Sequence, residues 1–163
     1  MYIELLGVFD FGGKMNFRKA TKEDVKHLAY LRKKQLIDEG CYSECNIDDE
    51  LERYFSIGIA NKGLLIWLAI ADENIIGTAG VCFFQYPPSF TNPTGKIAYI
   101  TNVYTRDEYR NRGIATKLLE LVMEEIKAEG CMFARLHASA QGRGLYEKMG
   151  FVDAQGFMSK NMI

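Results

Sequence analysis

The segment from Lys96 to Ala138 constrains the fold of this chain more than any other part of its sequence. Lys96–Thr105 has the apolar pattern of a long strand, and a glycine-containing turn leads from it into a helix over about residues 115–129. The apolar residues of that helix recur at positions i, i+1, i+4, i+5 and i+8, which places them on one helical face. A second strand is expected over Cys131–Ala138. The order strand, helix, strand predicts a right-handed crossover unit.

The residues on either side of this unit predict further strands and helices. Thr21 followed by Asp24 is a variant capping box at the start of a helix. Two apolar runs separated by a short turn predict a hairpin. The expected elements outside the crossover unit are a strand and helix within Asn16–Lys34, weak helix over residues 42–60, strands at Leu64–Ala71 and Ile75–Phe84, a short helix at Gln141–Met149, and a strand from Phe151 onward.

Length and composition indicate a single globular domain. The chain has 163 residues, of which 48% are hydrophobic and 25% charged, and this composition excludes a disordered or fibrous chain. We expect an α/β fold in the α+β sense, with a mixed, mostly antiparallel sheet of six or seven strands and helices on both faces. Residues 15–163 form the expected domain, and residues 1–14 an N-terminal extension whose role the sequence does not define.

Charge, hydropathy and cysteine content argue against several classes of function. The 20 basic and 21 acidic residues give a net charge of −1, which does not favour nucleic-acid binding. The longest apolar run, Leu64–Ala71, is far shorter than the roughly 20 residues of a membrane-spanning helix. Cys41 and Cys45 lack the CxxC spacing of a metal or redox site, so we expect reduced thiols, no metal site and a cytoplasmic location.

The turn between the long strand and its helix combines positive charge with small residues. Arg110, Arg112 and Lys117 contribute three positive charges to residues 109–117. Gly113 and Ala115 allow a ligand to approach the backbone, and the first N–H groups of a helix have no partner within it. These features predict a seat for a phosphate or pyrophosphate. A glycine turn with solvated arginines is the alternative interpretation.

A second segment, Leu136–Phe151, presents Tyr146 on the expected short helix. A phenolic O–H with an ordinary pKa near 10 is able to act as a general acid. The alternative is a half-buried tyrosine that packs on Leu145 and Phe151, which is the commoner situation for this residue.

Taken together, the two segments resemble the GNAT N-acetyltransferase superfamily. Arg110-Asn111-Arg112-Gly113-Ile114-Ala115 is similar to the Q/R-x-x-G-x-G/A motif of that family, and Leu145–Phe151 (LYEKMGF) is similar to its LYxxxGF motif. The order and spacing of the elements agree as well, and Phe17–Arg32 is similar to the family's first strand and helix. The resemblance covers about residues 15–160 and implies a GNAT-like fold.

The resemblance implies an enzyme that moves an acetyl group from acetyl-coenzyme A (acetyl-CoA) to a primary amine by direct attack in a ternary complex. The acceptor is a small-molecule or peptide amine that the sequence does not identify. No metal is expected, and homodimers are common in the family. A non-catalytic module that binds or senses acyl-CoA on the same fold is the alternative.

The resemblance also assigns residues to the implied site. Tyr146 would protonate the departing thiolate, and a bulged strand end would pair with the pantetheine arm and polarise the thioester. Ser139 and Gly142 stand where the family often has asparagine and alanine, and they are expected as weaker contacts. The implied acetyl-CoA contacts are Val103, Tyr104, Thr105, Arg110, Asn111, Arg112, Gly113, Ile114, Ala115, Thr116, Ser139 and Gly142.

The sequence does not identify the acceptor site or the base that deprotonates the acceptor amine. Residues 38–53 hold seven acids against one base. One hypothesis is that this stretch favours a cationic amine and supplies the base, and the alternative is a solvated helix face. We expect His27 and His137 to be structural, although either is able to serve as a base. The aromatic residues of segment 83–90 have three alternative interpretations: they line an acceptor pocket, they belong to the core, or they form a dimer surface. These residues are Phe83, Phe84, Tyr86 and Phe90.

Overall fold

The structure, a computed structural model, describes residues 15–41, 43–154, 156 and 158–162. The expected extension at residues 1–14 lies outside these described residues. Within them, five strands form one sheet in the order β1-β2-β3-β4-β5, antiparallel except for the last pair. The strands are β1 (Met15–Lys19), β2 (Leu64–Ala71), β3 (Asn74–Gln85), β4 (Lys96–Thr105) and β5 (Phe133–Arg135). The mixed, mostly antiparallel sheet is confirmed, with five strands rather than six or seven.

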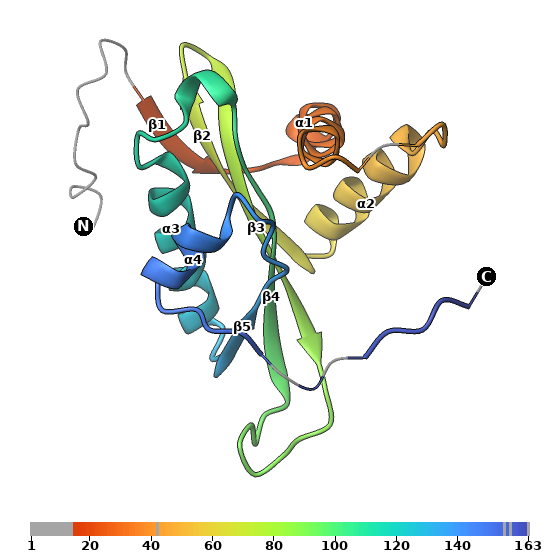
Figure 1. Ribbon diagram of the computed structural model, residues 1–163, viewed down its shortest axis with the longest axis vertical. Coiled ribbons are helices and arrows are strands. Elements are labelled where there is room, and N and C mark those ends of the chain that lie inside the picture. The colour runs from red at the N-terminus through yellow and green to blue at the C-terminus, as the bar shows by residue number, and fades with distance from the viewer. Residues whose placement is uncertain (1–14, 42, 155, 157, 163) are drawn as a thin grey trace.

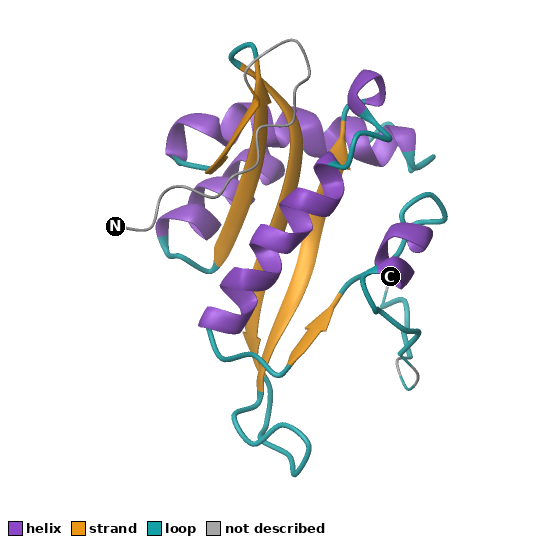
Figure 2. Ribbon diagram, turned by 90° about the vertical axis from the view of Figure 1, so that its left-hand side faces the viewer, coloured by secondary structure: helices purple, strands orange, loops and turns teal. Residues whose placement is uncertain are grey.

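Helices cover both faces of this sheet, as expected (Figures 1 and 2). Helix α3 packs on one face, and helices α1 and α2 pack on the other. The helices are α1 (Val25–Asp38), α2 (Asp48–Ala60), α3 (Ile114–Ala128) and α4 (Arg143–Lys148), with short 3-10 turns at Lys22–Asp24 and Asp107–Tyr109.

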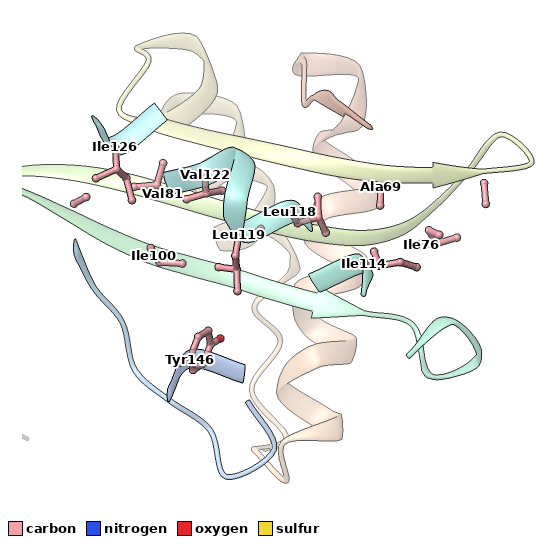
Figure 3. Packing of buried hydrophobic residues seen from close by; sticks show 13 residues of the cluster. Ala69, Ile76, Val81, Ile100, Ile114, Leu118, Leu119, Val122, Ile126 and Tyr146 are labelled. Atoms are coloured by element: carbon pink, nitrogen blue, oxygen red, sulfur yellow. The ribbon is translucent and has the colours of Figure 1, made fainter. Parts of the chain in front are cut away.

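The apolar face predicted for α3 forms the larger part of the core. Leu118, Leu119 and Val122 are fully buried against the sheet, and Tyr146 lies at the margin of this cluster beside β4 (Figure 3). On the opposite face, Phe55 of α2 is also fully buried. Burying a side chain of this size stabilises the fold by about 1.5–3 kcal/mol.

Strand β5 is much shorter than the expected strand at Cys131–Ala138. It pairs with β4 only along Ile97–Tyr99, and the chain then leaves the sheet. Residues 151–154, expected to begin another strand, are not in one. In the described part of the chain, the edge of β4 that faces away from β3 therefore has no neighbouring strand from Ile100 to Thr105.

The free part of β4 contains a β-bulge. Thr78 pairs with Tyr104 whereas Gly80 pairs with Thr101, so two residues of β4 oppose one residue of β3. Asn102, in this bulge, has a left-handed φ of 52°, and its carbonyl oxygen accepts a 2.7 Å hydrogen bond from the buried Thr78 hydroxyl. The extra residue reverses the alternation of side chains, so Ile100 packs towards α3 while Tyr104 packs towards α1.

An ion pair between the exposed Arg18 and the buried Asp24 joins β1 to the start of α1. Arg18 donates two hydrogen bonds of 2.7 and 2.8 Å to Asp24, which also accepts the Thr21 N–H at 2.8 Å. Thr21 and Asp24 thus form the predicted capping box. The hydrogen bonds from Arg18 are the main cause that lowers the pKa of Asp24 below its usual value.

Replacing Asp24 by asparagine is expected to lower the free energy of unfolding at neutral pH by about 2 kcal/mol, because charge-assisted hydrogen bonds are lost at a buried site. Since the folded-state pKa is depressed, this stabilisation is present above the pKa of an unfolded aspartate, about 3.9, and disappears as the pH falls through the folded-state value. Urea unfolding at about pH 7 and at acid pH measures both effects. Equal stability of the two proteins at neutral pH would contradict the assignment.

Candidate functional site

A cleft of about 600 Å³ opens where β4 and the chain after β5 separate. Its walls come from the end of α1, the free part of β4, the start of α3 and the segment around α4. The predicted site residues that line it are Val103, Tyr104, Thr105, Arg110, Asn111, Gly113, Ile114, Ala115, Thr116, Ser139, Gly142 and Tyr146. Arg112 is the predicted residue that does not line the cleft. Twelve of the thirteen predicted residues therefore meet at one place.

The start of α3 has the backbone geometry of an anion seat. Asn111 and Gly113 both have left-handed φ values, of 59° and 76°. The N–H of Lys117 donates to Gly113 O at 3.0 Å, so the preceding N–H groups of the first turn lack acceptors within the helix. A Cβ built on Gly113 would meet nothing within 4 Å, so there is open space beside this backbone. The start of α3 therefore has the backbone geometry and the open space that the predicted seat requires.

Arg110 connects three elements of the cleft rather than projecting freely into it. Its Nε donates to Thr105 O at 3.0 Å, and its guanidinium lies 2.7 Å from Asp107 and 3.6 Å from Asp38 at the end of α1. The guanidinium carbon also lies 5.8 Å from the centre of the Tyr104 ring. Arg110 therefore fixes the end of β4 against α1 while adding positive potential to the cleft.

Arg112 supports the same turn from outside the cleft. It donates to Glu108 O at 2.9 Å and lies over the ring of Tyr109, 5.4 Å from its centre. Sequence reasoning counted both arginines by charge alone, and charge does not show which donors already have partners. Arg112 is therefore not among the residues that line the cleft.

Tyr146 lies in the cleft wall and in the core at the same time. Only 8% of its surface is exposed, and its ring packs edge-on against Phe151 with 6.0 Å between ring centres. Burial, together with the negative charge of Glu39, raises the pKa of Tyr146 to about 12. The hydroxyl therefore remains protonated at neutral pH, as a proton donor must. The catalytic and the packing interpretations of this residue are compatible.

Local structure explains the residues at the two positions, 139 and 142, where this chain has serine and glycine in place of asparagine and alanine. Ser139 Oγ accepts the N–H of Gly142 at 3.2 Å, so it caps the turn that precedes α4. A Cβ on Gly142 would lie only 2.9 Å from the ring of Tyr146, so glycine allows this ring to sit against the backbone. Both residues position Tyr146 in addition to lining the cleft.

The Gly142→Ala variant is expected to displace the Tyr146 ring by several tenths of an ångström and to lower kcat about tenfold. Its thermal unfolding should change little, because alanine is the better helix former next to α4. Rates of thiol release from acetyl-CoA and thermal melts of both proteins measure the two effects. An unchanged kcat would show that the position of this ring does not limit the reaction.

Sequence reasoning missed the contribution of Arg32 and Gln35 of α1 to the cleft. They line it together with Asp38 at the end of α1 and Glu39 directly after it, two residues of the predicted acidic stretch. Gln35 continues the buried face begun by residues 28 and 31, and it is 8% exposed. A polar residue on an otherwise apolar helical face was the available signal for a functional or structural role.

The acidic stretch at residues 38–53 divides into two parts. Only Asp38 and Glu39 line the cleft. Asp48 accepts a 2.8 Å hydrogen bond from Lys33, and Asp48, Asp49 and Glu50 form the first turn of α2, where acidic residues are favourable. The interpretation as a solvated helix face holds for α2.

The other open candidates are also placed by the structure. His27 is exposed on α1 outside the cleft, whereas His137 is exposed and lines it, contrary to a purely structural role. Phe83 and Phe84 line a separate groove between α2 and β3. Tyr86 and Phe90 are exposed outside the cleft.

None of the described cysteines lines the cleft. Cys82 and Cys131 are half-buried, and burial is the main cause that raises the pKa of both thiols. No helix in the described ranges is long and apolar enough to cross a membrane.

Comparison with known proteins gives a consistent result. Residues 30–151 match the acetyltransferase (GNAT) family. A predicted acetyltransferase from Clostridium acetobutylicum, crystallised with acetyl-CoA, is 42% identical with a TM-score of 0.88, over 91% of this chain and 96% of its own. Glucosamine 6-phosphate N-acetyltransferase of Arabidopsis thaliana is 30% identical over 114 residues, 69% of this chain and 76% of its own length. A GCN5-related N-acetyltransferase from Ralstonia eutropha JMP134 has a similar fold, with a TM-score of 0.82 at 24% identity over 91% of this chain and 98% of its own.

Proposed function

Since this chain belongs to the acetyltransferase (GNAT) family and is an acyltransferase of that type, we propose that it transfers the acetyl group of acetyl-CoA to a primary amine. The transfer occurs by direct attack of the amine on the thioester in a ternary complex. The observation that carries this proposal is the placement of a free, bulged strand edge, a helix N-terminus and a protonated Tyr146 around one cleft.

The free edge of β4 is the proposed site of the pantetheine arm. Arg106 N–H donates to Ile76 O on β3 at 2.9 Å, so the N–H and carbonyl of Thr105 point to the opposite, free edge. At this free edge the Thr105 carbonyl accepts a hydrogen bond from Arg110, and the Val103 carbonyl accepts one from Gln35 at 3.3 Å. The N–H groups of Val103 and Thr105 are then the donors offered to the arm and the thioester, with Tyr104 between them.

The first turn of α3 is the proposed seat of the pyrophosphate. The N–H groups of residues 111–116 point outward at the positive end of the helix dipole, which stabilises an anion without a dedicated side chain. Arg110 and Arg112 add positive potential from beside this seat. Ser139 and Gly142 close the opposite wall of the cleft.

Tyr146 is the proposed general acid. As the amine nitrogen bonds to the thioester carbon and the carbon–sulfur bond breaks, the Tyr146 hydroxyl donates its proton to the departing sulfur. The raised pKa of Tyr146 keeps this proton in place until the sulfur carries charge. Holding amine and thioester in one cleft supplies a further large part of the rate.

An acceptor screen with a free-thiol readout tests the proposed function. The acceptors are spermidine, tobramycin, a lysine-containing peptide and glucosamine 6-phosphate, the last because it appears in the name of the Arabidopsis thaliana relative. We expect thiol release that depends on an added amine, with one acetylated product per thiol. Acetyl-CoA binding without transfer to any of these amines would favour a non-catalytic acyl-CoA module.

A further inference from the structure

We infer that Glu39 is the base that takes a proton from the acceptor amine, and that Gln35 positions it. This assignment rests on the proposed acetyl transfer. An alkylamine acceptor such as spermidine or a lysine side chain is mostly protonated at neutral pH because its pKa is near 10, so the enzyme must remove a proton before the nitrogen is able to attack.

The two carboxylates that line the cleft from α1 differ in their partners. Asp38 accepts the Tyr104 hydroxyl at 3.1 Å and the Lys34 ammonium at 3.2 Å, and the Arg110 guanidinium lies 3.6 Å away. Glu39 has a neutral partner, the Gln35 amide at 3.1 Å, and no basic side chain of the described residues forms an ion pair with it. Asp38 is therefore engaged in holding the cleft together, whereas Glu39 retains an uncompensated charge that faces the cleft.

Gln35 fixes Glu39 relative to the bulged strand. Its buried amide nitrogen donates both to Glu39 and to Val103 O, at 3.1 and 3.3 Å. Its amide oxygen accepts from Arg32 at 3.0 Å, so both ends of the amide have partners. A fully satisfied buried amide holds its partners in one arrangement. The carboxylate is thereby tied to the strand residue whose N–H faces the thioester.

Glu39 also lies within electrostatic range of the general acid. Both side chains line the same cleft, and the negative charge of Glu39 contributes to the raised pKa of Tyr146. Other charged or titratable groups line the same cleft from each neighbouring element. They are Arg32 and Asp38 of α1, Tyr99 and Tyr104 of β4, Tyr109 and Arg110 before α3, His137 after β5 and Lys148 of α4.

The proposed proton transfers balance. The Glu39 carboxylate takes one proton from the ammonium, the neutral nitrogen forms the bond to the thioester carbon, and the carbon–sulfur bond breaks. Tyr146 gives its proton to sulfur and regains one from the nitrogen as the amide forms. The proton on Glu39 passes to solvent, so the products are the amide, the free thiol of CoA and one released proton.

The test uses the full chain with the Glu39→Gln variant, which keeps shape and removes the charge. Glu44→Gln is the matched control, because it makes the same change in the same acidic stretch at a residue outside the cleft. With spermidine, tobramycin and glucosamine 6-phosphate as acceptors, we expect kcat/KM of Glu39→Gln to fall about 100-fold near pH 7. Near pH 9.5 the kcat/KM of Glu39→Gln should lie less than about tenfold below that of wild type, because more of the amine is neutral in solution.

Gln35→Met tests the positioning role, because methionine keeps the volume and removes both amide contacts. We expect a loss in kcat/KM of about tenfold near pH 7 that also narrows as the pH rises. The dissociation constant for acetyl-CoA should stay within about threefold of wild type in both variants. A loss that is equal at both pH values indicates a structural defect and would overturn the positioning role.

The outcomes separate this inference from the function on which it rests. If wild type transfers acetyl groups and Glu39→Gln has wild-type kcat/KM at both pH values, the base is another group and only the inference fails. If wild type transfers no acetyl group to any of the four amines of the acceptor screen, the proposed function fails and the assignment of Glu39 falls with it.

Discussion

The Tyr146→Phe variant is expected to release CoA thiol with a kcat about 10²–10⁴-fold below that of wild type, which is the usual contribution of a general acid. The substitution removes the hydroxyl alone, so the ring keeps its packing against Phe151 and its place at the margin of the core. The dissociation constant for acetyl-CoA should remain within about threefold, because the proposed binding contacts are backbone groups on β4 and α3. Initial rates of thiol release and equilibrium binding measure the two quantities.

The pH dependence of the wild type supplies an independent check of Tyr146. Because the pKa of Tyr146 is raised to about 12, its hydroxyl stays protonated to about pH 10. Deprotonation of this hydroxyl should therefore not lower kcat between about pH 8 and 10. Tyr30→Phe is the control for removing a tyrosine hydroxyl, since Tyr30 is 60% exposed on α1 and does not line the cleft. A Tyr146→Phe protein as fast as Tyr30→Phe would remove Tyr146 from the mechanism.

The Ala115→Asp variant is expected to weaken acetyl-CoA binding at least about 100-fold. Ala115 lies in the first turn of α3 and lines the cleft, so a carboxylate there meets the charge of the pyrophosphate at close range. The same carboxylate is favourable for the helix itself, because acidic residues in a first turn interact with the helix dipole. Thermal stability should therefore be retained while binding is lost, which separates a defect in the seat from a defect in folding.

Ala115→Asn is the matched control for this substitution, because it adds nearly the same volume without the charge. We expect the asparagine variant to bind acetyl-CoA within about tenfold of wild type, as measured by equilibrium dialysis with labelled acetyl-CoA. Equal losses in the two variants would show that space, not charge, limits this position. Wild-type binding by Ala115→Asp would place the pyrophosphate elsewhere.

Local patterns in the sequence predicted most of the elements because each element expresses its own periodicity. The apolar face of α3 and the strand at Lys96–Thr105 are examples, and the structure confirms both. The length of β5 was not predictable in this way. An apolar strand pattern over Cys131–Ala138 does not show how long the pairing is, and β5 pairs with β4 only as far as Tyr99, before the β-bulge at Asn102.

The site was only partly predictable for a similar reason. The sequence placed Gly113 and Tyr146 correctly in one cleft, because their motifs lie on two segments that adjoin in the fold. It did not show that Arg110 has partners on α1, nor that Gln35 bridges α1 and the bulge. Contacts between α1 and β4 join residues about 70 positions apart, and no local pattern encodes them.

Calorimetric titration of acetyl-CoA into the wild-type protein tests the central claim, that the cleft between β4 and the start of α3 holds this co-substrate. We expect one bound molecule per chain with a dissociation constant of about 1 mM or below, since about 1 mM is the upper end of the usual range of KM values. Affinity should fall sharply in an Arg110→Ala, Arg112→Ala double variant, which loosens the turn and removes two positive charges. The absence of binding by the wild type up to about 1 mM acetyl-CoA would contradict the account.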